Sequence, residues 1–343
     1  MGSAVGPRVQ PDSSTLGDTG AMLHLRIVSP AGQTEEVLGA LRDDPGISSL
    51  SVVPGAATRP AGDLVLADVA REAADDVVGR LRAVGVHRTG SVHIEPVPTW
   101  LSKDGYDAER RTPGSSADSV VWAQVIQRAY EDTELNWTYA SFMTLATLIA
   151  TVAIVLDSQI LVIGAMVLGP EFGAVAALGV ALVKRRRALF WRATRALLVG
   201  FAVAITLTTA FAWSAKLLGW VTLTDVTGPR PGTEFIYSPN KWSFIVALIA
   251  GAAGVLSLTS AKTGGLSGVF ISVTTIPAAG NVALGLAFGA STEVWGSTLQ
   301  LGINLSGMAL AGWATLAIQH AVWARASAKR AEFLARLRSR KDR

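Results

Sequence analysis

The chain has 343 residues, of which 50% are hydrophobic and only 16% are charged, and it contains no cysteine. Soluble domains carry about 25% charged residues, so the composition argues against an ordinary soluble protein. The lack of cysteine excludes disulfides, thiolate metal sites and cysteine nucleophiles.

The first segment, residues 1–21, is polar and contains Gly, Ser and Pro. It lacks the hydrophobic stretch of a signal peptide, so it predicts a disordered tail.

A small soluble domain is predicted over residues 22–98. Apolar and polar side chains alternate along 22–29, which is typical of a strand. Further strands are predicted at 47–53, 64–69 and 91–97, and helices at 33–42 and around 77–84. The resulting β-α-β-β-α-β order is ferredoxin-like. It resembles ACT-type regulatory domains, and this resemblance implies that a small metabolite is a candidate ligand of the domain.

Strand alternation brings four polar side chains to the sheet face opposite the helices: His24, Arg26, His93 and Glu95. A ligand or metal site there competes with a simpler interpretation, an open face that packs on another subunit or is wetted by water. Seven Lys/Arg against ten Asp/Glu in this domain argue against nucleic-acid binding.

The polar segment 99–118 predicts a linker, and residues 119–134 predict an amphipathic helix. Trp122, Tyr130 and Trp137 are typical of a helix at the membrane interface. The alternative is a coupling helix with no lipid contact.

Long windows without charge predict membrane spans, because ~20 apolar residues cross the hydrocarbon core. Six spans are predicted, at 135–156, 158–183, 194–218, 242–260, 265–290 and 297–323. Together they make 135–323 a transmembrane domain, preceded by the ferredoxin-like domain and followed by a basic tail at 324–343. The fold class is therefore an α-helical polytopic membrane protein with a small α+β domain in front.

Two matching phrases interrupt spans two and five: Pro-Glu-Phe-Gly-Ala-Val-Ala at 170–176 and Pro-Ala-Ala-Gly-Asn-Val-Ala at 277–283. A proline removes a helix donor and clashes with the preceding turn, and the freed groups must be satisfied inside protein. Breaks in corresponding places of two halves indicate a transporter's central site. Three spans per half predict a 3+3 inverted repeat, 135–218 and 242–323, with chance and shared small-residue composition as competitors. Kinked and re-entrant forms of the two spans both remain open.

Positive charge orients the spans, because Lys184–Arg187 and the tail 324–343 are rich in Lys and Arg. Both termini and the ferredoxin-like domain are predicted to lie on the cytoplasmic side of the cell's inner (plasma) membrane. The basic tail is either a topology signal or a contact for anionic lipid headgroups.

The run Gly164-Ala165-Met166 followed by Pro170 resembles the signature of a bacterial and archaeal membrane family, domain-of-unknown-function family 389. Its members typically show Gly-Ala-Met-x-x-(Ser/Gly)-Pro here, often with a second Gly-Pro that this chain replaces with Glu171, Phe172 and Gly173. The resemblance covers most of 120–320 and implies a multi-pass membrane protein, without a function to carry over.

Glu171 is the sharpest candidate for function, because an ionisable group inside the membrane is costly and usually faces a cavity, a partner or a pathway. It suits proton coupling or cation binding. The structural alternative is a carboxylate that caps the second half-helix, whose N-terminus favours anions. Asn281 is its expected counterpart in the other half, with helix packing as the alternative.

Further candidate site residues flank the two breaks or face them from span six. They are Pro170, Gly173, Thr274, Thr275, Pro277, Gly280 and Asn304, with Ser272 and Gln300 nearby. Asp157 and Glu293 are expected to be exposed residues at the ends of spans.

No phosphate loop, zinc spacing or nucleophile–base pattern occurs in the sequence, so we expect no catalytic residue, metal or cofactor, and no enzyme. The sequence favours a transporter or channel-like permease for a small solute or ion, bound near mid-membrane between the broken helices. The alternative is a membrane-anchored sensor or scaffold in which the ferredoxin-like domain is the working part. A homo-oligomer is expected under both interpretations.

Overall fold

The computed structural model describes residues 22–112, 114, 119–238, 240–259 and 274–341, with only the helical backbone for 326–341. The chain divides into two compact units, Met1–Ala117 and Asp118–Arg343, called here the N-terminal unit and the helical unit. The expected tail at 1–21, Ser272 and the first part of span five lie outside the described residues, as do the side chains of the basic tail from 326 onward.

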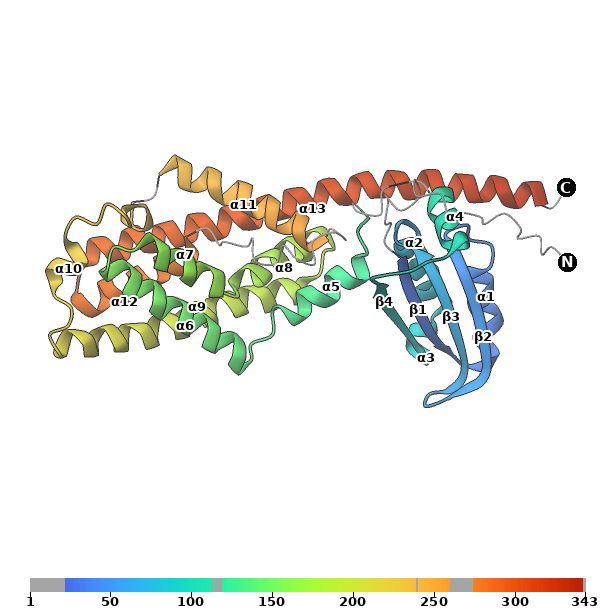
Figure 1. Cartoon of the computed structure of the whole chain (residues 1–343), viewed down its shortest axis with the longest axis horizontal. Helices are drawn as coiled ribbons and strands as arrows, with labels where there is room; N and C mark the ends of the chain where they lie inside the picture. The colour runs from blue at the N-terminus through green and yellow to red at the C-terminus, as the bar shows by residue number, and fades with distance from the viewer. Residues whose placement is uncertain (1–21, 113, 115–118, 239, 260–273, 342–343) are drawn as a thin grey trace, which may run out of the picture. The chain divides into compact units, whose positions relative to one another are not determined.

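The N-terminal unit contains a four-stranded antiparallel sheet (Figure 1). Its strands are β1 (Met22–Ser29), β2 (Ile47–Thr58), β3 (Ala61–Ala70) and β4 (Ser91–Val97), in the spatial order β2-β3-β1-β4. Leu25 on β1 lies opposite Ala67 on β3 and Ile94 on β4. Long-range pairing of the first strand with the third and fourth therefore holds the sheet together.

One face of the sheet is covered by helices. These are η2 (Ala31–Gln33), α1 (Thr34–Leu41), α2 (Arg71–Val84) and α3 (Val86–Thr89). The core consists of the alternate β1 residues Leu23, Leu25 and Ile27 and the apolar faces of α1 and α2. α2 ends at Gly85, whose φ of 88° is the left-handed conformation that glycine tolerates best. The opposite sheet face is free of these four helices and is covered in part by residues 103–111, described next.

The expected linker at 99–118 is corrected in part, because Lys103–Arg111 form a helix, α4, that packs on β2 and β3. The Ser102 side chain accepts a hydrogen bond from the Gly105 N–H at 3.2 Å, which caps the helix. The Trp100 and Tyr106 rings lie 4.5 Å apart, centroid to centroid. Capping and aromatic packing thus order a segment whose polar composition indicates a loop.

The helical unit is built from α5 to α13. Its elements are α5 (Trp122–Glu131), α6 (Trp137–Val155), α7 (Gln159–Leu168), α8 (Glu171–Val183), α9 (Arg187–Leu217), α10 (Leu223–Thr227), η3 (Glu234–Ile236), α11 (Lys241–Thr259), α12 (Thr275–Phe288) and α13 (Ser291–Lys341). Four helices, α6, α9, α11 and the first part of α13, are long and apolar enough to cross a membrane. The pair α7–α8 is a fifth candidate, bent by 54° at its break.

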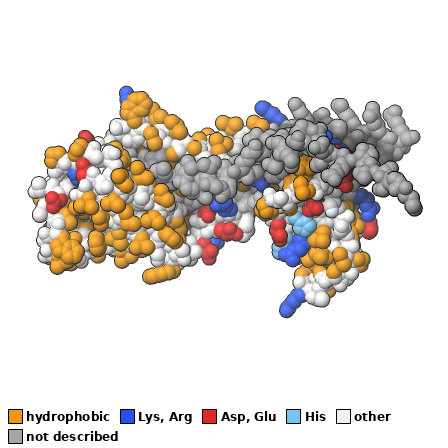
Figure 2. All heavy atoms as spheres, viewed as in Figure 1, with side chains coloured by type: hydrophobic (Ala, Val, Ile, Leu, Met, Phe, Trp, Pro, Cys, Tyr) orange, Lys and Arg blue, Asp and Glu red, His pale blue; other side chains and the backbone are white. Residues whose placement is uncertain are grey.

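The expectation of six spans is therefore met only in part within the described residues. α12 is apolar but has 14 residues, so it extends for about 21 Å and is shorter than the ~30 Å hydrocarbon core. Figure 2 shows hydrophobic side chains spread over the visible face of the helical unit. Large exposed apolar residues such as Leu198, Trp213 and Ile249 fit lipid contact better than water.

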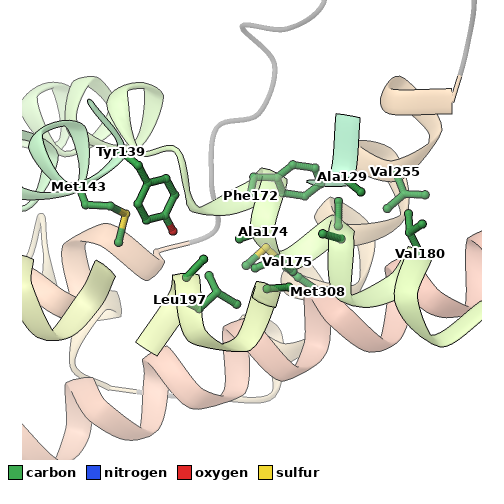
Figure 3. Close-up of a cluster of buried hydrophobic side chains, with 14 of the residues drawn as sticks. Ala129, Tyr139, Met143, Phe172, Ala174, Val175, Val180, Leu197, Val255 and Met308 are labelled. Atoms are coloured by element: carbon green, nitrogen blue, oxygen red, sulfur yellow. The ribbon is translucent and has the colours of Figure 1, made fainter. Parts of the chain in front are cut away.

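Small side chains let the helices of this unit pack closely. Alanine is the commonest residue of its core cluster, which also holds larger residues such as Met143, Phe172 and Met308 (Figure 3). At the α11–α13 crossing, a Cβ added to Gly251 would lie 2.6 Å from the carbonyl oxygen of Met308. Such backbone proximity is typical of helix packing in membranes, where van der Waals contact replaces the hydrophobic effect between helices.

A helix is observed within the expected range 119–134 as α5, and its apolar side packs on protein. Trp122 is buried in the core of the helical unit, its ring 3.8 Å from the Lys184 ammonium and 5.4 Å from the His320 ring. Ala129 is buried there as well, whereas Trp137 is exposed. α5 therefore couples to α8, as the alternative interpretation expects.

Acid should destabilise the N-terminal unit partly through Asp63. The Thr34 hydroxyl and then the Gly55 N–H hold the pKa of Asp63 below its ordinary value, because both donate to the carboxylate. A lowered folded pKa adds stability above the unfolded pKa of about 3.9, and that stability is lost as the pH falls through the folded pKa. In urea unfolding of fragment 1–117 between pH 7 and pH 3, Asp63→Asn and Thr34→Val should each lose this component. The exposed-hydroxyl control Thr58→Val should retain it, and equal pH profiles for all four proteins would contradict the assignment.

Gly251→Ala should destabilise the helical unit by about 1–3 kcal/mol, because the new methyl group meets backbone atoms of α13 that cannot rotate away. Gly302→Ala on α13 is the matched control, since nothing lies within 4 Å of its added Cβ. The measurement is unfolding of the full-length protein in detergent. Equal stability of the two variants would show that the crossing is looser than described.

Candidate functional site

The starts of α8 and α12 meet through a buried hydrogen bond. Glu171 is the first residue of α8 and Thr275 the first of α12, and both are fully buried. The Thr275 hydroxyl donates to Oε1 of Glu171 at 2.7 Å. A Cβ added to Gly169, just before the break, would lie 2.7 Å from the Ile276 side chain, so the two segments approach closely. The two matching phrases are therefore joined in space.

The two prolines begin helices rather than interrupt them. Pro170 is the N-cap residue of α8 and follows the 54° bend. Pro277 lies in the first turn of α12, which starts at Thr275, close to the break expected near Ile276-Pro277; the part of span five before Thr274 lies outside the described residues. The first-turn N–H groups of a helix have no intrahelical acceptor, so proline costs little there.

The Glu171 carboxylate lies at two helix N-termini, whose partial positive charge favours an anion. Tyr139 on α6 is also near, because Glu171 acts on its hydroxyl electrostatically. The Tyr139 ring packs on Gly200, and its buried hydroxyl has no hydrogen-bond partner among the described residues. Both a structural and a ligand-binding carboxylate fit these surroundings.

Two glycines near the breaks serve close packing. A Cβ added to Gly173 would lie 2.7 Å from the Cβ of Asp132, the residue that ends α5. Burial raises the pKa of Asp132 above its ordinary value, and Arg128 opposes this shift. Gly280 packs on Thr151, whose hydroxyl donates to the Thr147 carbonyl at 2.8 Å. The glycines thus bring α8 onto α5 and α12 onto α6.

Thr274 joins the start of α12 to α13. Its hydroxyl oxygen accepts hydrogen bonds from the amide nitrogens of Asn304 at 2.7 Å and Gln300 at 3.2 Å. Gln300 Nε2 also lies 3.4 Å from Oδ1 of Asn304. Gln300 is 1% exposed, and its Oε1 has no hydrogen-bond partner among the described residues. Gln300 thus brings an acceptor without a described partner to Thr274, the residue next to Thr275 of the Glu171–Thr275 pair.

Asn281 lies apart from Glu171, contrary to the expectation of one shared site. It is six residues beyond Thr275, about 9 Å along α12. Its Nδ2 donates to Glu293 Oε2 at 2.7 Å and to Ser297 Oγ at 2.8 Å. Arg230 completes this second cluster, donating to Asn281 Oδ1 at 3.2 Å and to Glu293 Oε2 at 2.9 Å.

The expectation that Glu293 and Asp157 are exposed is wrong. Glu293 is 8% exposed because Arg230, from the loop between α9 and α11, covers it. Asp157 accepts hydrogen bonds from the Gly232 N–H at 3.0 Å and the Thr233 hydroxyl at 2.8 Å. Both carboxylates hold the same loop against the helices.

Sequence reasoning missed most of the second cluster, although part of its signal was present. Four polar residues recur at i, i+4, i+7 and i+11 along α13, hence on one helix face: Glu293, Ser297, Gln300 and Asn304. We call them the α13 polar stripe. Arg230 has no comparable signal, because it lies in a Gly- and Pro-containing loop 63 residues before Glu293.

The N-terminal unit holds a smaller polar group on the sheet face opposite α1 and α2. His24 Nδ1 lies 2.7 Å from Asp68 Oδ1, and Glu95 is opposite His24 in the register of β1 and β4. Arg26 and His93 lie opposite each other in the same register, two residues further along the strands. In the described parts of the chain, no group of three or more His, Asp or Glu side chains is arranged to hold a metal ion.

The Arg230–Glu293 pair should behave as a buried ion pair. Arg230→Ala and Glu293→Ala should each destabilise the protein by about 3–5 kcal/mol, because each leaves a buried charge unpaired. The double variant should cost less than the sum of the two. Unfolding in detergent measures the cycle, with Lys216→Ala as a control that removes a cation outside this cluster, one that donates to the Ala287 carbonyl and lies over the Phe288 ring. Additive single effects would show that the two charges do not interact.

Among known families, the one described as Domain of unknown function (DUF389) matches residues 166–310. This segment includes α8, both polar clusters and the whole α13 polar stripe. Comparison with curated proteins and with solved structures gives no match. The family match confirms the resemblance recognised from Gly164-Ala165-Met166 and Pro170, and residues 166–310 are those of a DUF389 domain.

Proposed function

We propose that the protein is an integral membrane transporter or channel-like permease for a small solute or ion, bound beside Glu171 where α8 and α12 begin. The observation that carries the proposal is the Glu171–Thr275 hydrogen bond, which joins two helix starts within apolar surroundings. A carboxylate buried at this depth is costly unless it serves a structural or transport role. Half-helices that meet near mid-membrane form the binding sites of many secondary transporters.

An inverted repeat is part of the proposal. In it, spans 135–218 and 242–323 are equivalent halves, and residues 265–290, which include α12, form the span that corresponds to α7–α8. Cross-packing supports this layout, because α8 packs on α13 and α12 packs on α9. Likewise Phe172 of α8 meets Gly254 of α11, while Gly280 of α12 meets Thr151 of α6. In this layout, α8 of the first half packs on helices of the second half, and α12 of the second half packs on helices of the first.

Each candidate residue has a role in this proposal. Glu171 binds a cation or a proton, Thr274 and Thr275 supply hydroxyl groups, and Asn304 and Gln300 supply amide groups from α13. Pro170, Gly169 and Pro277 fix where the half-helices start. Gly173 and Gly280 permit close helix approach. Asn281 belongs to the separate cluster around Arg230.

We further propose that both termini lie in the cytoplasm and that the loop between α9 and α11 faces outside. The cluster Lys184–Arg187 next to α8 supports this orientation through the positive-inside rule. The N-terminal unit would then act in the cytoplasm as a ferredoxin-like regulatory or oligomerisation domain. Its β-α-β-β-α-α-β order and the sheet order β2-β3-β1-β4 support that assignment.

A second candidate function is a membrane-anchored sensor or scaffold. It is favoured by the sheet face opposite α1 and α2, where His24 pairs with Asp68 beside the part of the face that α4 covers. Under this reading, candidate metabolites should raise the unfolding temperature of fragment 1–117 but not that of fragment 118–343.

Glu171→Gln tests the transport proposal. The full-length protein is reconstituted in liposomes, and movement of protons, Na⁺ and K⁺ is followed with fluorescent indicators. We expect Glu171→Gln to lower flux about tenfold or more, a change of about 1.4 kcal/mol or more in the barrier, and to abolish its pH dependence. Glu134→Gln, which alters an exposed carboxylate, is the control and should leave both unchanged. Unaltered flux and pH dependence in Glu171→Gln would exclude a coupling role for this carboxylate.

A further inference from the structure

The α13 polar stripe connects the two polar clusters of the helical unit. α12 and α13 run antiparallel, joined by a turn at Gly289 with φ of 73°. Asn281 therefore lies opposite Glu293 and Ser297, and Thr274 lies opposite Gln300 and Asn304. Because Thr275 bonds to Glu171, polar side chains run from Arg230 to the site proposed above. The membrane-facing surfaces of these helices are apolar, so this internal row is a feature that packing alone does not require.

The chemistry of the row favours a cation. Its described acceptors are the carboxylates of Glu293 and Glu171 and the amide oxygens of Asn281, Gln300 and Asn304. Arg230 is the one positively charged side chain among the residues in this row. Gln300 Oε1 is buried with no described partner, so a donor or a cation would satisfy it.

Arg230 contacts the helices through its guanidinium group. One nitrogen donates to Asn281 and another to Glu293, and the cation lies 4.8 Å from the Tyr237 ring centroid. Its Nε is buried with no described partner. Asn281, Glu293 and Tyr237 therefore present two oxygen acceptors and an aromatic face, which together match a planar cation with several N–H donors.

The backbone that carries Arg230 is a connecting loop, not a spanning helix. It lies between α9 and α11 and includes two short helices, α10 and η3. Two hydrogen bonds to Asp157, the two hydrogen bonds of Arg230 itself and the buried side chains of Val226 and Ile236 hold this loop against the helices. Tyr237 belongs to the same loop and packs on Gly296 of α13. Withdrawal of Arg230 while Tyr237 stays in place would leave the Glu293 carboxylate without its cation and the rest of the site intact.

We infer that Asn281, Glu293 and Tyr237 form a binding site for a guanidinium-type cation, and that Arg230 occupies this site as an internal ligand. While the loop is closed, Arg230 excludes solute cations from the row that leads to Glu171. The inference rests on the proposed function in one respect only, because passage to Glu171 requires transport, whereas binding at the Arg230 site does not.

Chemical rescue tests the site directly. Full-length Arg230→Ala in detergent should unfold at a lower temperature than the wild type, and millimolar methylguanidinium should raise its midpoint by roughly 3–6 °C. Methylurea, a neutral molecule of the same shape, should not do so. The wild type should gain nothing, because Arg230 fills the site. Lys216→Ala should also gain nothing, because the described contacts of Lys216, the Ala287 carbonyl and the Phe288 ring, offer no carboxylate.

Two further variants keep the result decisive. In Arg230→Ala with Glu293→Gln, methylguanidinium should no longer rescue, because the carboxylate is gone. If Arg230→Ala fails to fold, Arg230→Gln takes its place in the same measurements. Equal stabilisation by methylurea, equal stabilisation of the wild type, or no stabilisation of either Arg230 variant would overturn the site.

Flux measurements separate this inference from the proposed function. In liposomes, Arg230→Ala should pass methylguanidinium at least several-fold faster than the wild type. Adding Glu171→Gln should abolish that flux while leaving the rescue of stability intact. Rescue without any flux in Arg230→Ala would support the binding site and contradict transport, whereas flux without rescue would contradict the binding site alone.

Discussion

The requirement that polar groups inside a membrane find partners within the protein governs the architecture of the helical unit. The Glu171–Thr275 hydrogen bond shows this requirement most clearly, because one buried carboxylate meets the starts of two helices at once. Where α7 ends and α8 begins, the chain bends by 54°, and the free N–H groups of the new helix face a negative charge. A helix break exposed to lipid would be prohibitively costly, whereas this one lies inside the protein, where the starts of α8 and α12 meet.

Close helix packing makes this junction possible. Alanine is the commonest residue in the core of the helical unit, and glycines occur where α11 crosses α13 and where α12 crosses α6. With small residues at the crossings, side-chain hydrogen bonds can reach between helices, as Thr274 does to Asn304. Close packing and hydrogen bonding therefore support each other. A bulkier residue at a crossing would move the helices apart and break the hydrogen bonds between them.

Two buried acids, each in the first turn of a helix, have different surroundings. Glu171 follows a helix break and bonds to a neutral hydroxyl, whereas Glu293 begins a long helix and pairs with a guanidinium from a loop. A pair such as Arg230–Glu293 contributes less to stability than its short distance suggests, because both ions must first lose their water. Its value lies in specificity, since it determines where the loop between α9 and α11 is held. This is why we regard the pair as part of a gate rather than as a stability element alone.

The sequence by itself determined the class of the protein and much of its layout. Charge-free windows predicted the long apolar helices, alternation predicted β1 and β4 at their observed bounds, and the phrase around Pro170 predicted both the break and the DUF389 match. These features succeed because hydrophobic period and proline chemistry are local properties of a chain.

Only the tertiary structure decided which polar residues meet. The analogy between the two phrases predicted that Glu171 and Asn281 share a site. In the structure, Asn281 forms hydrogen bonds with Arg230 and Glu293, whereas Glu171 forms one with Thr275. It also ordered Lys103–Arg111 as a helix within an apparent linker. The physical reason is that hydrogen bonds and ion pairs between distant segments depend on how the helices align and on where a loop folds back against them. Neighbouring residues in one sequence carry no signal for either property.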